Sequence, residues 1–254
     1  NGLKQGIFRE FDLTGDTVVN SFFYEQDTLI AKGIVLKSGE YDGYWEYYYK
    51  SGELEEKGKY VNGVKEGKWV FYHENGKKEQ EGKYKKGVPN GMWTSYFDNA
   101  VLRKQEYFRK GRPDGEYMEY DRDGNEIISG AYFNGKREEL WTYQYNDHYS
   151  KGEYSDGDKN GLWIEKYLKT NTLRFKGEFS YGAEKGKHKA YYPNGRLKYL
   201  GKYKSGNRHG SWRFYRDDGS EAGEVLYKFG KPIRINGEPI KNKKKVEKIL
   251  KEME

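Results

Sequence analysis

Aromatic and polar residues alternate along this chain in short segments, and each segment is followed by a glycine-containing turn. The segment Trp69 to His73 is typical. Successive side chains of a β-strand point to opposite faces, so Trp69 and Phe71 are expected on one face and Tyr72 on the other. The pattern predicts β-strands with aromatic rings on both faces.

The turn residues predict how the strands pair. A three-residue loop over positions 74–76 would set Tyr72 opposite Lys78 in a second, more polar strand. The same register sets Tyr48 opposite Leu54 in the preceding segment. Gly76 supplies the positive φ that such a turn needs. Each segment therefore reads as a β-hairpin.

The hairpin recurs along the chain as G-x-W-x-[YF]-Y-x-x-x-G followed by G-x-Y-x-x-G, and successive units are 22 to 25 residues apart. All six tryptophans occupy the third position of this unit. We expect the residues at this position to be structural aromatics that stack between neighbouring hairpins. They are Trp45, Trp69, Trp93, Tyr117, Trp141, Trp163, His188 and Trp212.

One such unit is too small to fold alone, because its few large side chains cannot offset the entropy lost on ordering it. The predicted fold is therefore all-β: tandem hairpins of about 24 residues that form an elongated, single-layer, twisted antiparallel sheet. We expect degenerate repeats over 1–42, eight hairpin repeats over 43–230, and a C-terminal strand and capping helix over 231–254. An apolar stripe over 241–254 favours the helix, which could cap the last hairpin or contact a partner.

Composition and charge narrow the class of protein. Charged residues make up 34% of the chain and aromatic residues 17%, so folding is expected, but with much surface per residue. The last 24 residues carry 8 Lys+Arg and 4 Asp+Glu. The other residues carry 39 Lys+Arg and 36 Asp+Glu, so the repeat body has a small net charge. This near-neutral body argues against a nucleic-acid partner.

No apolar run is long enough to span a bilayer. The absence of Cys excludes disulfides and leaves the compartment open.

Nothing in the pattern predicts catalysis, a metal site or a cofactor. The four histidines, His73, His148, His188 and His209, lie in different units without metal-ligand spacing. The Gly-x-x-Gly strings join strand to strand, so no helix N-terminus is available to bind a phosphate. Acidic pairs fall in turns and polar strands, where solvated charge explains them. We therefore expect a non-enzymatic protein with no cofactor.

The Gly and aromatic spacing of these units resembles MORN repeats, and more closely the bacterial MORN-repeat variant, over roughly Gly6 to Gly230. The match is poor at Glu139, where the opening glycine is lost. The resemblance implies a single-layer hairpin array. It also implies an exported bacterial protein, periplasmic or at the cell surface, whose signal segment would precede Asn1. Some members are labelled antitoxin components.

A long sheet with exposed aromatic rings favours recognition of a protein partner. A carbohydrate or cell-surface module is the alternative, as is anionic-lipid binding through the basic C-terminal tail. A binding site is expected where the repeat pattern breaks, because the fold there imposes its residues least. The candidate surface residues at these breaks are Tyr117, Gln144, Tyr145, His148, Tyr149 and His188.

Overall fold

The structure is a computed structural model that describes residues 2–240. Every regular element in this range is a β-strand, and the strands are numbered β1 to β22. They divide into two compact units, one of Asn1–Glu126 with Tyr132–Gly135 and the other of Ile127–Ala131 with Lys136–Glu254. Strand β12 (Glu126–Phe133) contributes residues to both units.

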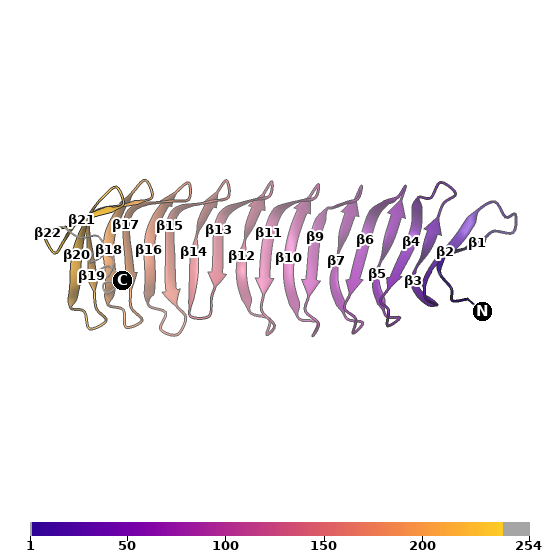
Figure 1. The fold of residues 1–254 in the computed structure, drawn as a ribbon, viewed down its shortest axis with the longest axis horizontal. Helices are drawn as coiled ribbons and strands as arrows, with labels where there is room; N and C mark the ends of the chain where they lie inside the picture. The colour runs from indigo at the N-terminus through magenta and orange to yellow at the C-terminus, as the bar shows by residue number, and fades with distance from the viewer. Residues whose placement is uncertain (1, 241–254) are drawn as a thin grey trace. The chain divides into compact units, whose positions relative to one another are not determined.

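The first unit is an antiparallel meander in which each strand pairs with the one before it. The exception is β9, which pairs with β7, as does the two-residue strand β8. Figure 1 labels these strands, apart from β8, in order from the N-terminus. They are β1 (Gly6–Phe11), β2 (Val18–Glu25), β3 (Thr28–Val35), β4 (Tyr41–Tyr48), β5 (Leu54–Val61), β6 (Val64–Tyr72), β7 (Lys78–Lys85), β8 (Val88–Pro89), β9 (Gly91–Tyr96), β10 (Leu102–Arg109) and β11 (Arg112–Tyr120).

The second unit repeats the same antiparallel meander. Its strands are β13 (Lys136–Gln144), β14 (His148–Ser155), β15 (Asp158–Tyr167), β16 (Leu173–Ser180), β17 (Ala183–Tyr191), β18 (Leu197–Lys204), β19 (Asn207–Tyr215), β20 (Glu221–Lys228), β21 (Lys231–Ile235) and β22 (Glu238–Pro239).

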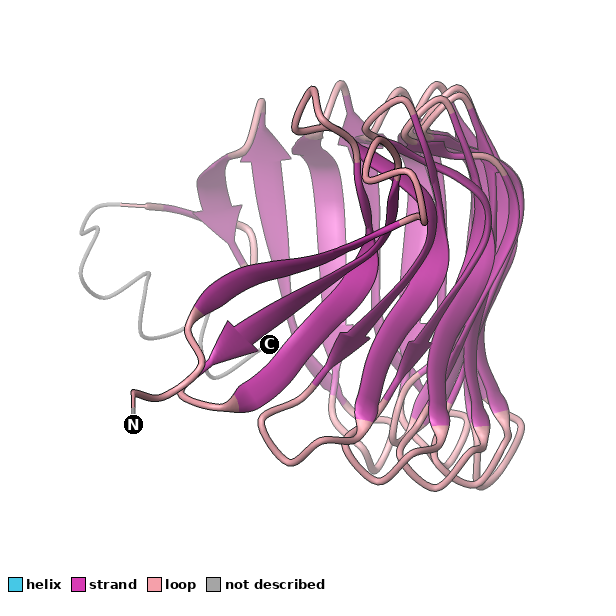
Figure 2. Ribbon diagram, turned by 90° about the vertical axis from the view of Figure 1, so that its right-hand side faces the viewer, coloured by secondary structure: helices cyan, strands magenta, loops and turns pink. Residues whose placement is uncertain are grey.

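Tight turns join the strands at both ends, as Figure 2 shows. The turns between repeats place two successive residues at positive φ, as at Asn62 (50°) and Gly63 (76°). This is the conformation of a type I′ turn, whose twist matches that of the flanking strands. The second residue of these corners is glycine, as at Gly63, Gly87 and Gly206, because glycine adopts positive φ without steric cost.

The pairing within each hairpin follows the predicted register. Tyr72 lies opposite Lys78, and Tyr48 lies opposite Leu54. One residue earlier the register shifts, because Phe71 pairs with Gln80 and leaves Glu79 as the extra residue of a β-bulge. The bulge recurs in other hairpins, as at Glu55 and Arg174, and adds one unpaired residue to the second strand. The hairpin of β13 and β14 pairs without it.

The tryptophan rings all lie on one face of the sheet in each unit, which we call the indole face. Trp69 is fully buried there, although the sheet has a single layer. Its ring contacts the rings of Tyr60, Phe71 and Tyr84, with centroids 5.1, 6.4 and 6.1 Å away. The core is thus a row of aromatic clusters, each shared between adjacent hairpins.

These features confirm the predicted fold class: an all-β, hairpin-by-hairpin antiparallel sheet, present in each unit. A strand does follow the last repeat, as β21. The helix predicted over 241–254 lies outside the described residues.

Candidate binding cavity

Each tryptophan of the repeat lies flat across a glycine of the preceding strand. A Cβ atom added to Gly58 would lie 2.2 Å from the Trp69 ring, far inside contact distance. The glycine is therefore required because the ring occupies the space of a side chain. The same contact joins Gly33 to Trp45, Gly82 to Trp93, Gly130 to Trp141, Gly152 to Trp163, Gly177 to His188 and Gly201 to Trp212.

A hydrogen bond fixes the orientation of these rings. The indole Nε1 of Trp69 donates to the backbone carbonyl of Lys59 at 3.1 Å. His188 reproduces this bond, since its Nε2 lies 2.9 Å from the carbonyl oxygen of Glu178. A carbonyl only accepts, so Nε2 carries the hydrogen. His188 is only 2% exposed.

Our expectation that His188 is a surface residue is therefore wrong. Its ring is a smaller substitute for tryptophan and belongs to the packing of the indole face.

The unit that contains Tyr117 departs from the glycine–tryptophan pair at both positions. The glycine slot holds Glu106, whose side chain would collide with an indole, and the ring slot holds the smaller Tyr117. Glu106 pairs with Lys104 at 3.0 Å, and the Tyr117 hydroxyl donates to Glu119 at 2.7 Å. Burial raises the pKa of Tyr117. This break is a half-buried polar cluster.

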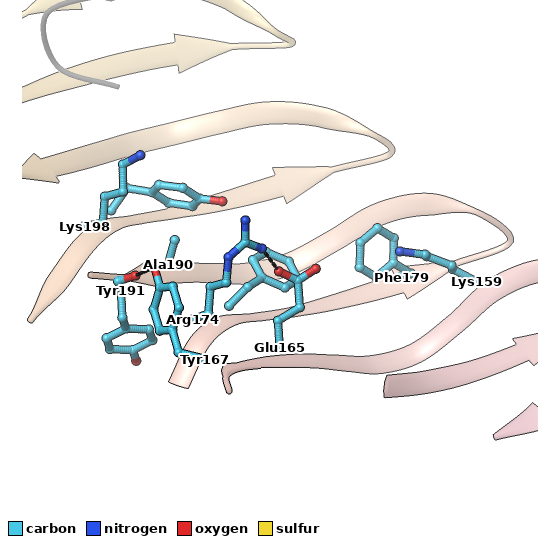
Figure 3. A pocket seen from close by; sticks show the side chains of 10 residues that line it. Lys159, Glu165, Tyr167, Arg174, Phe179, Ala190, Tyr191 and Lys198 are labelled. Atoms are coloured by element: carbon cyan, nitrogen blue, oxygen red, sulfur yellow. Dashed lines mark hydrogen bonds and ion pairs between the residues drawn. The ribbon is translucent and has the colours of Figure 1, made fainter. Parts of the chain in front are cut away.

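A second break leaves a cavity. Two residues after the ring position, on the indole face, several repeats carry a large ring, namely Tyr47, Phe71, Tyr143 and Phe214. The repeats of Trp163 and His188 instead carry Glu165 and Ala190 there. Without a ring at these two neighbouring positions, a cavity of about 320 Å³ opens on the indole face of β15 to β18 (Figure 3). It is lined by Lys159, Glu165, Tyr167, Arg174, Phe175, Phe179, Ala190, Tyr191, Lys198 and Tyr199.

Two charged side chains reach this cavity through the β-bulges. The register passes from Leu173 to Phe175 in β16, so Arg174 is the extra residue, and Lys198 is the extra residue of β18. A bulge redirects the side chain of its extra residue. Arg174 forms an ion pair with Glu165, which occupies the large-ring position of its own unit.

The cavity combines aromatic walls with an excess of positive charge. Its lining holds three cations, Lys159, Arg174 and Lys198, and one carboxylate, Glu165. Lys159 also lies over the Trp163 ring, 3.9 Å from the centroid. Burial raises the pKa of Tyr199 to about 12. The Tyr199 hydroxyl therefore stays protonated at neutral pH and can donate a hydrogen bond.

Two of the candidate residues lie next to this cavity. His148 is 3.9 Å from the Glu165 carboxylate and 3.4 Å from the Arg174 guanidinium, measured from Nε2. Tyr145 stacks on His148, with centroids 4.6 Å apart. These two residues extend the aromatic and charged lining beyond the cavity itself.

The other candidates lie elsewhere. Gln144 and Tyr149 pair with each other across β13 and β14, and their positions place them on the face opposite the tryptophans. Tyr117 belongs to the polar cluster of β10 and β11 described above.

Sequence reasoning missed the residues that form the cavity. Ala190 and Glu165 were detectable by comparing the residue two places after each ring, where the large side chain is missing. Arg174 and Lys198 were not, because a bulge cannot be located from strand alternation alone.

Within residues 2–240, no group of three or more His, Asp or Glu side chains is placed to hold a metal ion. The same range contains no helix long and apolar enough to cross a membrane.

Comparison with known proteins identifies the repeat. The segments 41–62, 65–86 and 184–205 match the family model described as MORN repeat variant. No curated protein matches the chain. Two solved structures, titled "Crystal Structure of TcdB2-TccC3-Cdc42" and "Crystal Structure of TcdB2-TccC3", are 13% identical to it, with TM-scores of 0.19 and 0.20. The match covers 89% of this chain and spans 14% of the length of those chains.

Proposed function

Since three of its hairpin units are MORN repeat variants, we propose that this chain is a non-catalytic repeat scaffold that binds a protein partner through the cavity on β15 to β18. The observation that carries the proposal is the absence of a ring at two neighbouring positions that line the cavity, Glu165 and Ala190. Repeats with Tyr47, Phe71, Tyr143 or Phe214 at this position carry a ring there, so a cavity at β15 to β18 is not a requirement of the fold.

The lining favours an acidic partner segment with an apolar side chain. Phe175, Phe179 and Tyr199 offer a surface for an apolar or aromatic side chain. Arg174 and Lys198 stand beside them and could pair with a carboxylate. A cavity of about 320 Å³ has room for one large side chain of a partner. Tyrosine and arginine are also enriched where protein interfaces concentrate their binding energy.

The proposal is tested by site-specific photocrosslinking in an extract of the native host. A benzoylphenylalanine placed at Lys198 should give one reproducible protein adduct. Ala190→Phe, which restores the ring found at Phe71 and Phe214, should remove that adduct while leaving the fold intact. The matched control is Ser95→Phe, which restores a ring at the same position of another unit and should leave the adduct unchanged.

The identity of the adduct decides between the classes of ligand. Peptides in its mass spectrum support a protein partner. A glycan alone would overturn the proposal in favour of a carbohydrate-binding module. An adduct that persists in Ala190→Phe would show that the cavity is not the binding site.

A further inference from the structure

The face opposite the tryptophans carries shallow clefts at the glycine positions of the repeat. One lies on β4 to β6 and another on β17 to β19, with volumes of about 470 and 390 Å³. Gly58 and Gly67 line the first, and Gly201 and Gly210 occupy the same repeat positions in the second. The two clefts are thus the same element of the repeat with different side chains around it.

In the first cleft, two carboxylates offset most of the charge of three lysines. Lys57, Lys59 and Lys68 line it together with Glu46 and Glu66. Both carboxylates already have partners: Glu46 lies 2.7 Å from the Lys32 ammonium, and Glu66 accepts a hydrogen bond of 2.7 Å from the backbone N–H of Lys86.

In the second cleft, the acidic positions are replaced. His209 stands where Glu66 stands in the first, and the lining carries Lys187, Lys202 and Arg213 without any carboxylate. Glu224, outside the lining, lies 3.5 Å from Arg213 and accepts a hydrogen bond from Ser211. Within the described part of the chain, neither Lys187 nor Lys202 has an ion-pair partner. We call this site the basic cleft.

The strand register adds electrostatic repulsion at the basic cleft. Lys187 lies directly opposite Lys202, and Lys176 lies directly opposite Lys189 on the neighbouring pair of strands. Like charges at directly opposed positions destabilise a sheet. The Nδ1 atom of His209, which lines the same cleft, is buried without a hydrogen-bond partner. The basic cleft therefore combines closely spaced positive charges with a buried nitrogen atom that has no hydrogen-bond partner.

We propose that the basic cleft binds an anionic phosphate or sulfate group. Such a group would accept hydrogen bonds from the ammonium groups of Lys187 and Lys202 and from Arg213. It would thereby remove their mutual repulsion. The cleft is open and large enough for the group to be part of a larger molecule, so a free phosphate ester, a sulfated glycan and a lipid headgroup share the recognised chemistry.

The probe is sodium pyrophosphate, titrated into the full chain by calorimetry at low ionic strength. Lys202→Glu should weaken binding about tenfold or more, because it removes one charge-assisted hydrogen bond and adds repulsion. The matched control is Lys59→Glu, at the equivalent position of the first cleft on β5, which should change affinity less than about twofold. Thermal unfolding should show that Lys202→Glu does not destabilise the fold, since it relieves an opposed pair.

Further titrations distinguish the sources of the anion. Sucrose octasulfate and phosphatidylcholine vesicles with or without phosphatidic acid replace pyrophosphate, and the probe whose affinity responds most to Lys202→Glu identifies the class. Equal losses in Lys59→Glu and Lys202→Glu, or no saturable binding of any probe, would overturn the proposal. Ala190→Phe should leave anion binding unchanged, so this result is independent of the partner cavity.

Discussion

At the scale of single residues, the fold depends on the contact between a glycine and an indole. Glycine is required at this position because the ring of the next hairpin occupies the space that a Cβ atom would need. One repeat departs from this contact at both positions, since it has Glu106 in the glycine slot and Tyr117 in the ring slot. The two positions therefore act as a pair.

The first prediction follows from this pair. Gly58→Ala should destabilise the protein by about 3 kcal/mol, because a methyl group cannot be accommodated 2.2 Å from the Trp69 ring without displacing it. Chemical denaturation measures the loss. Adding Trp69→Tyr should recover part of it, since a smaller ring leaves room for the methyl group. Lys59→Ala, on the opposite face, should change stability by less than about 0.5 kcal/mol.

A second prediction concerns acid stability. Hydrogen bonds from Lys68 and Lys78 lower the pKa of Glu81 from 4.5 to about 2. A carboxyl group whose pKa is lower in the folded state stabilises the fold above its unfolded pKa, and this contribution disappears as the pH falls through the folded value. Both lysines are substantially exposed, so we expect this interaction to contribute about 1 kcal/mol to the free energy of unfolding.

Urea denaturation at pH 6, 4 and 2.5 checks this prediction. Glu81→Gln should be less stable than the wild type at pH 6, and the difference should shrink toward pH 2.5. A constant difference across this range would contradict the assignment.

At the scale of the strand and hairpin, the sequence predicts most of what the structure contains. The period of the tryptophans and the Gly turns predict each hairpin, its loop length and the opposition of Tyr72 and Lys78. The bulge at Glu79 and the cavity at Ala190 are not predictable in this way. They depend on which side chain of one hairpin fills the space beside the next, and a single-strand pattern does not contain that information.

The opening residue of each repeat gives a third prediction. This position adopts positive φ in most units, as at Gly67 (69°), but Glu139 holds the same conformation at 60°. A left-handed conformation costs a residue with a Cβ atom roughly 1–2 kcal/mol. Glu139→Gly should therefore stabilise the protein by about 1 kcal/mol, measured by thermal or chemical denaturation.

The neighbouring residue provides the control for that experiment. Glu138 accepts a hydrogen bond of 2.6 Å from the backbone N–H of Asp156. Glu138→Gly should consequently destabilise the protein, and a stabilising effect of both substitutions would refute the conformational argument.

At the scale of the whole molecule, stability is expected to be distributed along the repeats. Each aromatic cluster is shared by adjacent hairpins only, as where Trp212 packs with Tyr203 and Tyr227. Repeat proteins of this kind approximate a sum of nearest-neighbour interactions. A local defect should then be felt mainly by the hairpins beside it.

Hydrogen exchange tests this fourth prediction. Gly201→Ala would place a Cβ atom 2.0 Å from the Trp212 ring. Amide exchange should accelerate in β17 to β20 and stay unchanged in β4 to β7. Uniform acceleration in every described strand would instead show that the chain unfolds as one cooperative body.

The β-bulge has a consequence for how such a protein can change over generations. Its extra residue makes no ladder pair and differs between hairpins, with Glu55 and Glu79 in the first unit and Arg174 and Lys198 in the second. Mutation there can reverse the local charge at little expense to folding. The residues that the fold requires, the glycine and the indole of each pair, are thus different from the bulge residues, which can change to suit a new ligand.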